Sequence, residues 1–156
     1  MSQQGVRGYY QLTSTIEEEL LSNLLTNTVS IGDISKLNLN KQDIFPLAHM
    51  IVNNVTVEEQ VLRFNISILA CDIVDQSKDE TTDRFTGNDN EQDILNTQLA
   101  VLNKLIQRLR MGSLHTDMYQ LEGNPSLTPF NDRFENQLAG WSSTMDILIY
   151  NDIYIC

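Results

Sequence analysis

The sequence predicts an α+β fold in which an antiparallel sheet with a long β-hairpin packs against two amphipathic helices. Two segments repeat apolar residues at helical spacing, and others alternate apolar and polar residues with the period of a half-buried strand. The expected order is α-β-β-β-α-β-β. Because helices and strands do not alternate one by one, this order favours an antiparallel sheet over a parallel one.

The first helix is expected to begin near Ser14 or Thr15. Each is followed three residues later by a glutamate, which is the spacing of a capping box. Residues 1–8 are small and polar, and they predict a flexible N-terminal arm. Between residues 27 and 40 the pattern is weak and indicates a strand or two and a turn. The apolar stripe of the helix consists of Ile16, Leu20, Leu21, Leu24 and Leu25.

A long hairpin is the strongest β signal. Residues 47–57 are rich in branched apolar side chains, and residues 61–73 alternate, with Glu58–Glu59–Gln60 as the expected tip. Two strands of this length predict a tip that reaches beyond the domain toward a neighbour. The apolar face of the second strand is expected to hold Leu62, Phe64, Ile66, Ile68 and Ala70.

The second helix is expected to start at Asp89, with Gln92 three residues on, and to end before Gly112. A polar, acidic loop over 75–90 precedes it, and loops of this length are often functional or disordered. After the helix come a short strand over 118–121, an extended stretch over 127–134 interrupted by Pro129, and an alternating strand over 138–150. The helix stripe consists of Leu95, Leu99, Leu102, Ile106 and Leu109, widened by Val101 and Leu105.

Chain length and net charge limit the number of domains and the classes of function that fit this sequence. A chain of 156 residues fits a single domain, 1–156, and 21 acidic residues against 10 basic ones give a net charge of −11. An acidic surface repels phosphate, so a protein that grips DNA or RNA is disfavoured. Cys71 and Cys156 indicate free thiols in a reducing compartment. Neither a secretory leader nor a membrane-length apolar stretch is apparent, which predicts a soluble protein made in a cytoplasm.

The sequence shows no pattern typical of catalysis. His49 and His115 lie far apart and lack a second metal ligand at close spacing. Cys71 and Asp72 would point to opposite faces of a strand, so they do not form a nucleophile–base pair. Glycine-rich phosphate loops and nucleophile elbows are absent. We therefore expect no catalytic residue, no metal and no cofactor: the chain is predicted not to be an enzyme.

Candidate contact residues lie on the hairpin, the acidic loop and the late strands. Arg63 and Arg133 are isolated positive charges that could pair with carboxylates of another subunit, and Phe85 is the large apolar side chain of the loop and a candidate anchor on another subunit. For each residue the alternative is a contact within its own subunit. The candidate subunit-interface residues are Glu58, Glu59, Arg63, Phe85 and Arg133.

Three stretches carry a resemblance to a known group. RFNISILACDIVDQSKDE (63–80), NDNEQDILNTQLAVLNKLIQRL (88–109) and DRFENQLAGWSSTMDILIYND (132–152) resemble segments of small neck and tail proteins of tailed bacteriophages. Over residues 10–156, the order of elements and the chain size are similar to those of tail-terminator and tail-completion proteins. The resemblance does not separate a tail terminator from a head–tail connector or another neck ring protein.

The resemblance implies a virion structural protein that forms a homo-oligomeric ring of six or twelve subunits. Such a ring surrounds the DNA channel between portal and tail, with portal, connector and tail proteins as partners and no membrane. An acidic lumen would let DNA slide through during genome ejection without specific binding. A closed ring joins two different patches of one subunit, and we expect the hairpin (47–73) and the acidic loop (75–90) to supply them.

Two alternatives remain open at this point. A monomeric binding module would use a sheet face or loop for a protein or ligand, and a small hydrolase would use loop carboxylates. The second requires buried, converging polar groups, for which the sequence gives no sign.

Overall fold

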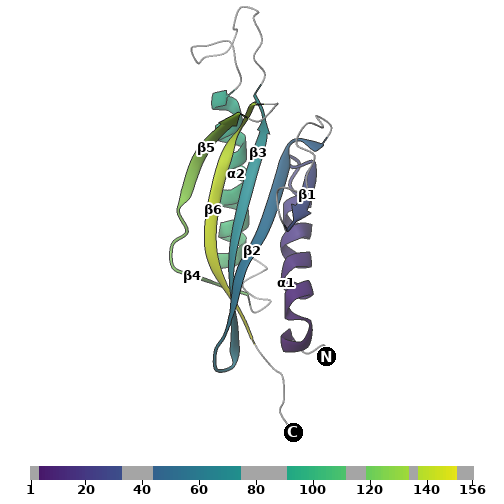
Figure 1. Ribbon diagram of the computed structural model, residues 1–156, viewed down its shortest axis with the longest axis vertical. Helices are drawn as coiled ribbons and strands as arrows, with labels where there is room; N and C mark the ends of the chain where they lie inside the picture. Colours follow the sequence, from purple (N-terminus) through teal and green to yellow (C-terminus); the bar gives the residue numbers. More distant parts are fainter. Residues whose placement is uncertain (1–3, 33–43, 75–90, 112–118, 134–136, 151–156) are drawn as a thin grey trace, which may run out of the picture.

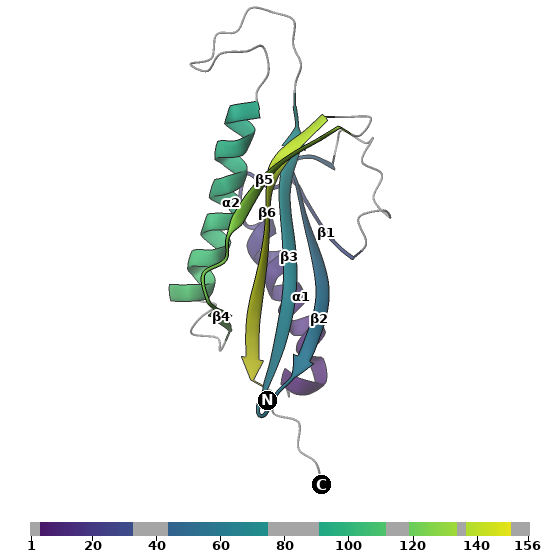
Figure 2. The same cartoon turned by 60° about the vertical axis from the view of Figure 1, so that its left-hand side comes forward.

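A six-stranded sheet carries both helices on one face (Figures 1 and 2), which confirms the predicted α+β fold. The computed structural model describes residues 4–32, 44–74, 91–111, 119–133 and 137–150. We call the face under the helices the inner face and the opposite face the outer face. The elements are α1 (Gln4–Leu21), β1 (Thr28–Ile31), β2 (Leu47–Val57), β3 (Val61–Ile73), α2 (Glu91–Met111), β4 (Gln120–Glu122), β5 (Leu127–Arg133) and β6 (Gln137–Tyr150).

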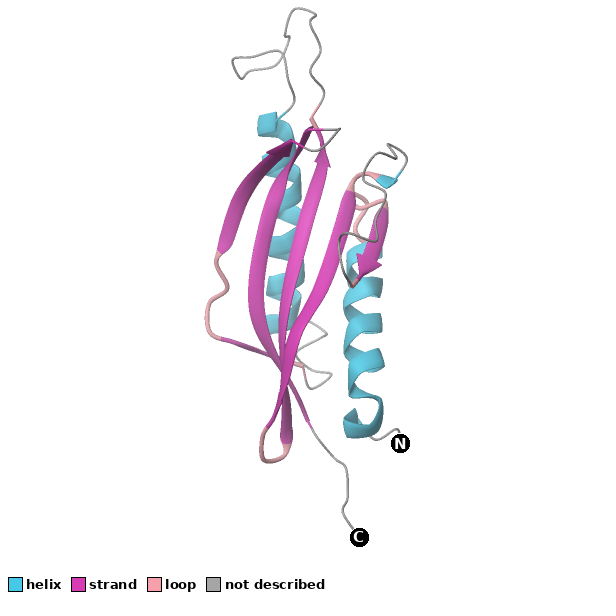
Figure 3. Ribbon diagram, viewed as in Figure 1, coloured by secondary structure: helices cyan, strands magenta, loops and turns pink. Residues whose placement is uncertain are grey.

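The long hairpin is confirmed as β2 and β3, and it forms the centre of the sheet with β6 (Figure 3). The strand order is β1-β2-β3-β6-β4, and β5 also pairs with β6. β4 and β5 therefore share one edge of β6, at different heights along it. At the tip, Gln60 takes a positive φ of 64°, and the Glu58 N–H donates to the carbonyl oxygen of Val61 over 3.0 Å.

The expectation of a purely antiparallel sheet is corrected at β1, which runs parallel to β2. A parallel pair needs a long connection, and residues 32–46 provide one. The weak apolar pattern of this region gives no sign of strand direction. A second difference follows α2, where three strands form instead of two. The extended stretch is the strand β5, and it tolerates Pro129 because β5 pairs on one side only among the described residues.

The first helix begins ten residues earlier than the candidate cap at Ser14, at Gln4, so the expected arm over 1–8 is helical from residue 4 onward. Residues 1–3 lie outside the described part of the chain. Gly8 explains why the apolar stripe did not reveal this turn. A Cβ there would lie 2.9 Å from Cδ1 of Ile149 and 3.2 Å from Cδ1 of Leu62, so the backbone itself packs against the sheet. The Thr15 hydroxyl donates to the Gln11 carbonyl over 2.7 Å and caps nothing.

Both helices contribute to one apolar core on the inner face. α2 spans the expected residues, although the predicted caps at Asp89 and Gly112 lie outside the described chain, and Leu99 of its predicted stripe is exposed. The helices also meet through an ion pair between Arg108 and Glu19, with 2.6 Å between Nε and Oε2. The fully buried large apolar side chains of this core are Leu12, Ile16, Leu20, Met50, Phe64, Ile66, Ile68, Leu102, Leu109 and Ile147.

Trp141 fixes α2 to the sheet. This residue lies on the inner face of β6, and its indole N–H donates to the carbonyl oxygen of Leu95 in α2 over 2.7 Å. A buried carbonyl in a helix already accepts one hydrogen bond, so this second bond adds direction to an otherwise apolar contact. The acidic loop over 75–90 lies outside the described residues, and its predicted role is not addressed by the structure.

Candidate assembly surfaces

The half of β2 that leads to the hairpin tip is an open sheet edge. β1 pairs only with Leu47–Met50, and from Asn53 to Val57 every side chain is exposed. In the described part of the chain, no strand lies beside this half of β2. Among the described residues, the outward N–H and C=O groups of this half are paired with no strand, and such groups are a template for pairing with another strand. We call Ile51–Val57 the β2 edge.

Near the tip of the hairpin, Arg63 binds carboxylates of its own subunit. Its Nε donates to Oε1 of Glu58 over 2.9 Å, and its Nη1 pairs with Glu122 and lies 3.8 Å from Oδ2 of Asp146. The hydrogen bond that Arg63 donates to Glu58 is the largest influence and raises the pKa of the guanidinium. Desolvation opposes it, and the charges of Glu58 and Asp146 add to the rise. Three carboxylates thus surround one cation, so the partner expected for Arg63 in another subunit is already supplied by its own.

The other candidate interface residues differ in whether the structure describes their side chains. Glu58 is engaged with Arg63, and Glu59 is exposed in the hairpin turn. Arg133 is the last residue of β5, but its side chain is not among those described. Phe85 lies outside the described residues. The structure therefore brings Glu58 and Arg63 together and leaves the roles of Phe85 and Arg133 as predictions.

A second apolar surface was not foreseen and lies where α1 turns toward β1. Leu24 is fully exposed, although sequence periodicity placed it in the helix stripe. α1 ends at Leu21, and the buried Asn23 redirects the chain: its Oδ1 accepts a hydrogen bond from the Leu25 N–H over 3.0 Å. We call Leu21, Leu24 and Leu25 the leucine patch; all three are exposed and lie within five residues of one another at the end of α1.

Polar side chains form a ladder across the middle of the outer face. The Asn53 amide donates to Oδ1 of Asn65 and to the hydroxyl of Ser67, both over 2.8 Å. The Asn65 amide in turn donates to Asp146, and the Ser67 hydroxyl shares a 2.8 Å hydrogen bond with Thr144. These hydrogen bonds satisfy polar groups on the face opposite α1 and α2, and they join β2, β3 and β6 on the outer face of the sheet.

A small apolar cluster lies on the outer face at the end of the sheet opposite the hairpin tip. Phe45, Leu47, Cys71 and Leu138 are buried there, with Phe130 packed against them. Burial raises the pKa of the Cys71 thiol to about 12, with a smaller contribution from the charge of Asp72. Burial also raises the pKa of Asp72 itself, offset in part by the hydrogen bond from the Ile73 N–H. The thiol is consequently held in its neutral, unreactive form.

We expect Cys71 to resist thiol reagents in the folded protein. In a Cys156→Ser variant at pH 8, reaction with a disulfide reagent should be at least ~100-fold slower in buffer than in urea, since only the thiolate attacks. The raised pKa also means that this group's contribution to stability is complete below about pH 8.5 and is lost as the pH rises toward 12. Rapid labelling of the folded variant would show that this end of the sheet opens.

A polar pair, His49 and Ser30, joins β2 to β1. His49 is fully buried; its Nδ1 lies 2.6 Å from the Ser30 hydroxyl and its Nε2 lies 2.7 Å from the carbonyl oxygen of Gly32. An Nε2–H donor and an Nδ1 acceptor satisfy both contacts. A serine beside a histidine also occurs in nucleophilic catalysis. Here, however, the imidazole lies between two paired strands, where it fixes the parallel register of β1.

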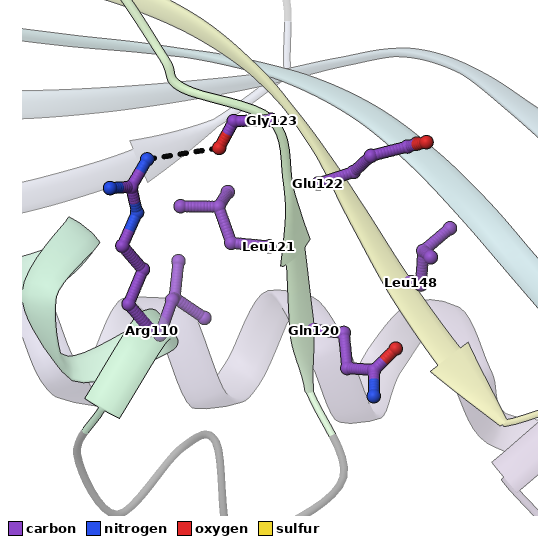
Figure 4. A pocket seen from close by; sticks show the side chains of 7 residues that line it. Arg110, Gln120, Leu121, Glu122, Gly123 and Leu148 are labelled. Carbon is purple, nitrogen blue, oxygen red and sulfur yellow. Dashed lines mark hydrogen bonds between the residues drawn. The ribbon is translucent and has the colours of Figure 1, made fainter.

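A shallow hollow of about 380 Å³ lies between the end of α2, β4 and β6 (Figure 4). Arg110 borders it and donates to the carbonyl oxygen of Gly123 over 2.9 Å and to Oδ1 of Asn124 over 2.8 Å. The guanidinium is therefore used to hold the turn after β4. Leu109, Leu121 and Leu148 line the remainder with Gln120 and Glu122, so the hollow is open and of mixed polarity.

Among the described side chains, histidine, cysteine and carboxylate groups do not gather in threes that would hold a metal ion. Within the same residues, neither helix is long and apolar enough to cross a bilayer. The sequence matches no protein-family model and no curated protein at a significant level.

Proposed function

We propose that this chain is a structural subunit of a homo-oligomeric ring and acts by packing rather than by chemistry. The observation that carries the proposal is that one subunit exposes two different surfaces that no other described residue covers, the β2 edge and the leucine patch. A closed ring joins two different patches of neighbouring copies, whereas a two-fold dimer uses one patch twice. Large exposed apolar side chains grouped together are typical of protein–protein contacts.

We further propose that the ring belongs to the neck or tail of a tailed bacteriophage, as a tail terminator or head–tail connector. Support comes from the resemblance of residues 63–80, 88–109 and 132–152 to such proteins. The net charge of −11 is compatible with a channel through which DNA passes without binding. Portal, connector and tail proteins are then the neighbours on either side, and the virion is the location.

Mass measurement of the purified protein tests the ring directly. Native mass spectrometry and negative-stain microscopy should show a closed oligomer of six or twelve copies with a central hole. Antibody labelling of virions should place the protein at the neck. A chain that stays monomeric at high concentration, both alone and with its neck partners, would end the ring proposal.

Leu24→Glu is expected to disrupt assembly while leaving the fold intact. The side chain is fully exposed in the subunit, so unfolding free energy should change by no more than about 0.5 kcal/mol. A charge buried in an apolar contact is costly, so the oligomer should dissociate at concentrations where the wild type is assembled. Gln107→Glu adds the same charge at an exposed position of α2 and serves as the control. Equal oligomer populations for both variants would remove the leucine patch from the contact.

A monomeric binding module is the second candidate function. The hollow bordered by α2, β4 and β6 favours it, since a small ligand or peptide end would fit beside Leu121 and Leu148. The mass measurement separates the two functions, because a module needs no second copy.

A further inference from the structure

The β2 edge differs from the other edge of the sheet in the features that discourage pairing. On the opposite side, β5 contains Pro129, which lacks an N–H, and β4 ends in the charged Glu122. The β2 edge contains neither proline nor charge, and three of its seven residues are valine. Its one irregularity is a bulge at Asn53, and Asn54–Val57 are regularly paired with β3 on their other side.

The chain itself contains a segment suited to this edge. Residues 151–156 (Asn-Asp-Ile-Tyr-Ile-Cys) follow β6 directly, and Ile153, Tyr154 and Ile155 are residues that favour strands. β6 ends at Tyr150, which is paired with Val61 next to the tip of the hairpin. β6 therefore ends at the same end of the sheet as the β2 edge. The residues that follow it contain one charged side chain, Asp152.

Distance favours an edge in a second copy over the edge of the same subunit. To lie beside β2 of its own subunit, the segment would cross three strand spacings, about 14 Å, and pass around the hairpin tip. Six extended residues span at most about 20 Å, so roughly two-thirds of the segment would be spent on the crossing. A neighbouring copy placed below the hairpin could accept the whole segment.

We propose that residues 151–156 of one copy add as a strand to the β2 edge of the next copy. This inference rests on the proposed ring and names one of its contacts. Donor and acceptor are different parts of the chain, so each copy gives one strand and receives one, which is the requirement for a closed ring. Backbone hydrogen bonds supply the contact, and Val55 and Val57 lie beside the added strand.

Two charge variants of the full chain test the contact. Val57→Lys alters the acceptor and Ile153→Glu alters the donor, and each alone should raise the concentration needed for half-assembly by roughly tenfold or more. Val57 is 73% exposed, so circular dichroism and melting of the subunit should not change. Thr128→Lys places the same charge on the exposed surface of β5 as a control and should assemble like the wild type.

Mixing the two variants distinguishes pairing between neighbouring copies from pairing within one subunit. In an alternating ring, every altered acceptor meets an altered donor of opposite charge, and every other contact is wild type. Mass photometry of the mixture should therefore recover assembly, which neither variant shows alone. Variants that assemble like the wild type would overturn the strand contact while leaving the ring function in place. Two impaired variants without recovery would show that the segment pairs within its own subunit, and a monomeric wild type would overturn both proposals.

Discussion

Replacing Gly140 with alanine is expected to cost about 3 kcal/mol of unfolding free energy or more. Gly140 lies on the outer face of β6, opposite Cys71 in β3. A Cβ at this position would overlap the carbonyl oxygen of Ala70 and lie 2.7 Å from Cα of Cys71. Both atoms belong to the backbone of the central strand, so neither can move aside in the way that the end of a flexible side chain would. The two longest strands would have to separate.

Urea denaturation followed by tryptophan fluorescence measures this cost. Ser142→Ala is the matched control, because it lies two residues further along the same face of β6 and removes rather than adds an atom. Its unfolding free energy should remain within about 0.5 kcal/mol of the wild type. An alanine variant at 140 that is equally stable would mean that β3 and β6 are not packed as closely as described.

Replacing His49 with alanine is expected to lower the unfolding free energy by about 3 kcal/mol. The imidazole is fully buried and contacts both the Ser30 hydroxyl and the Gly32 carbonyl. Its removal leaves a cavity and deprives the Gly32 carbonyl oxygen of this hydrogen-bond donor. Since both contacts lie on or just after β1, hydrogen exchange should quicken first at the amides of Val29 and Ile31.

Ser30→Ala separates the two contributions of this contact. It removes the hydroxyl and keeps the imidazole with its bond to Gly32, so the expected loss is only about 1 kcal/mol. If the two variants were equally stable, the histidine would not be the group that holds β1 in register.

The elements with strong periodicity were predictable, and those fixed by tertiary contacts were not. β3 and α2 follow their apolar patterns because each has one covered face. The direction of β1 could not be read, because four residues carry no directional signal and the partner strand decides it. The first turns of α1 were missed because Gly8 contacts the sheet through its backbone, and no side-chain pattern records such a contact.

The candidate surfaces divide in the same way. The hairpin tip and the pairing of Glu58 with a nearby arginine lie within a short stretch of sequence, so Glu58 and Arg63 were identified, although their mutual contact was not. Glu122 and Asp146 join them only through the sheet register. The leucine patch was not predicted because a helix that continued past Leu21 would have buried Leu24. The signal that could have found the helix end is Asn23, a residue that favours turns.

Trp141 is the only tryptophan of the chain, and its indole is bound to α2. Its emission therefore reports whether the helix is docked on the sheet, while the β2 edge lies on the far side of β3 and leaves the indole untouched. Loss of subunit structure and separation of intact subunits would consequently carry different optical signatures, with a spectral shift in the first case and none in the second. A dilution series read by both light scattering and fluorescence would distinguish a dissociating assembly from a melting fold without any added label.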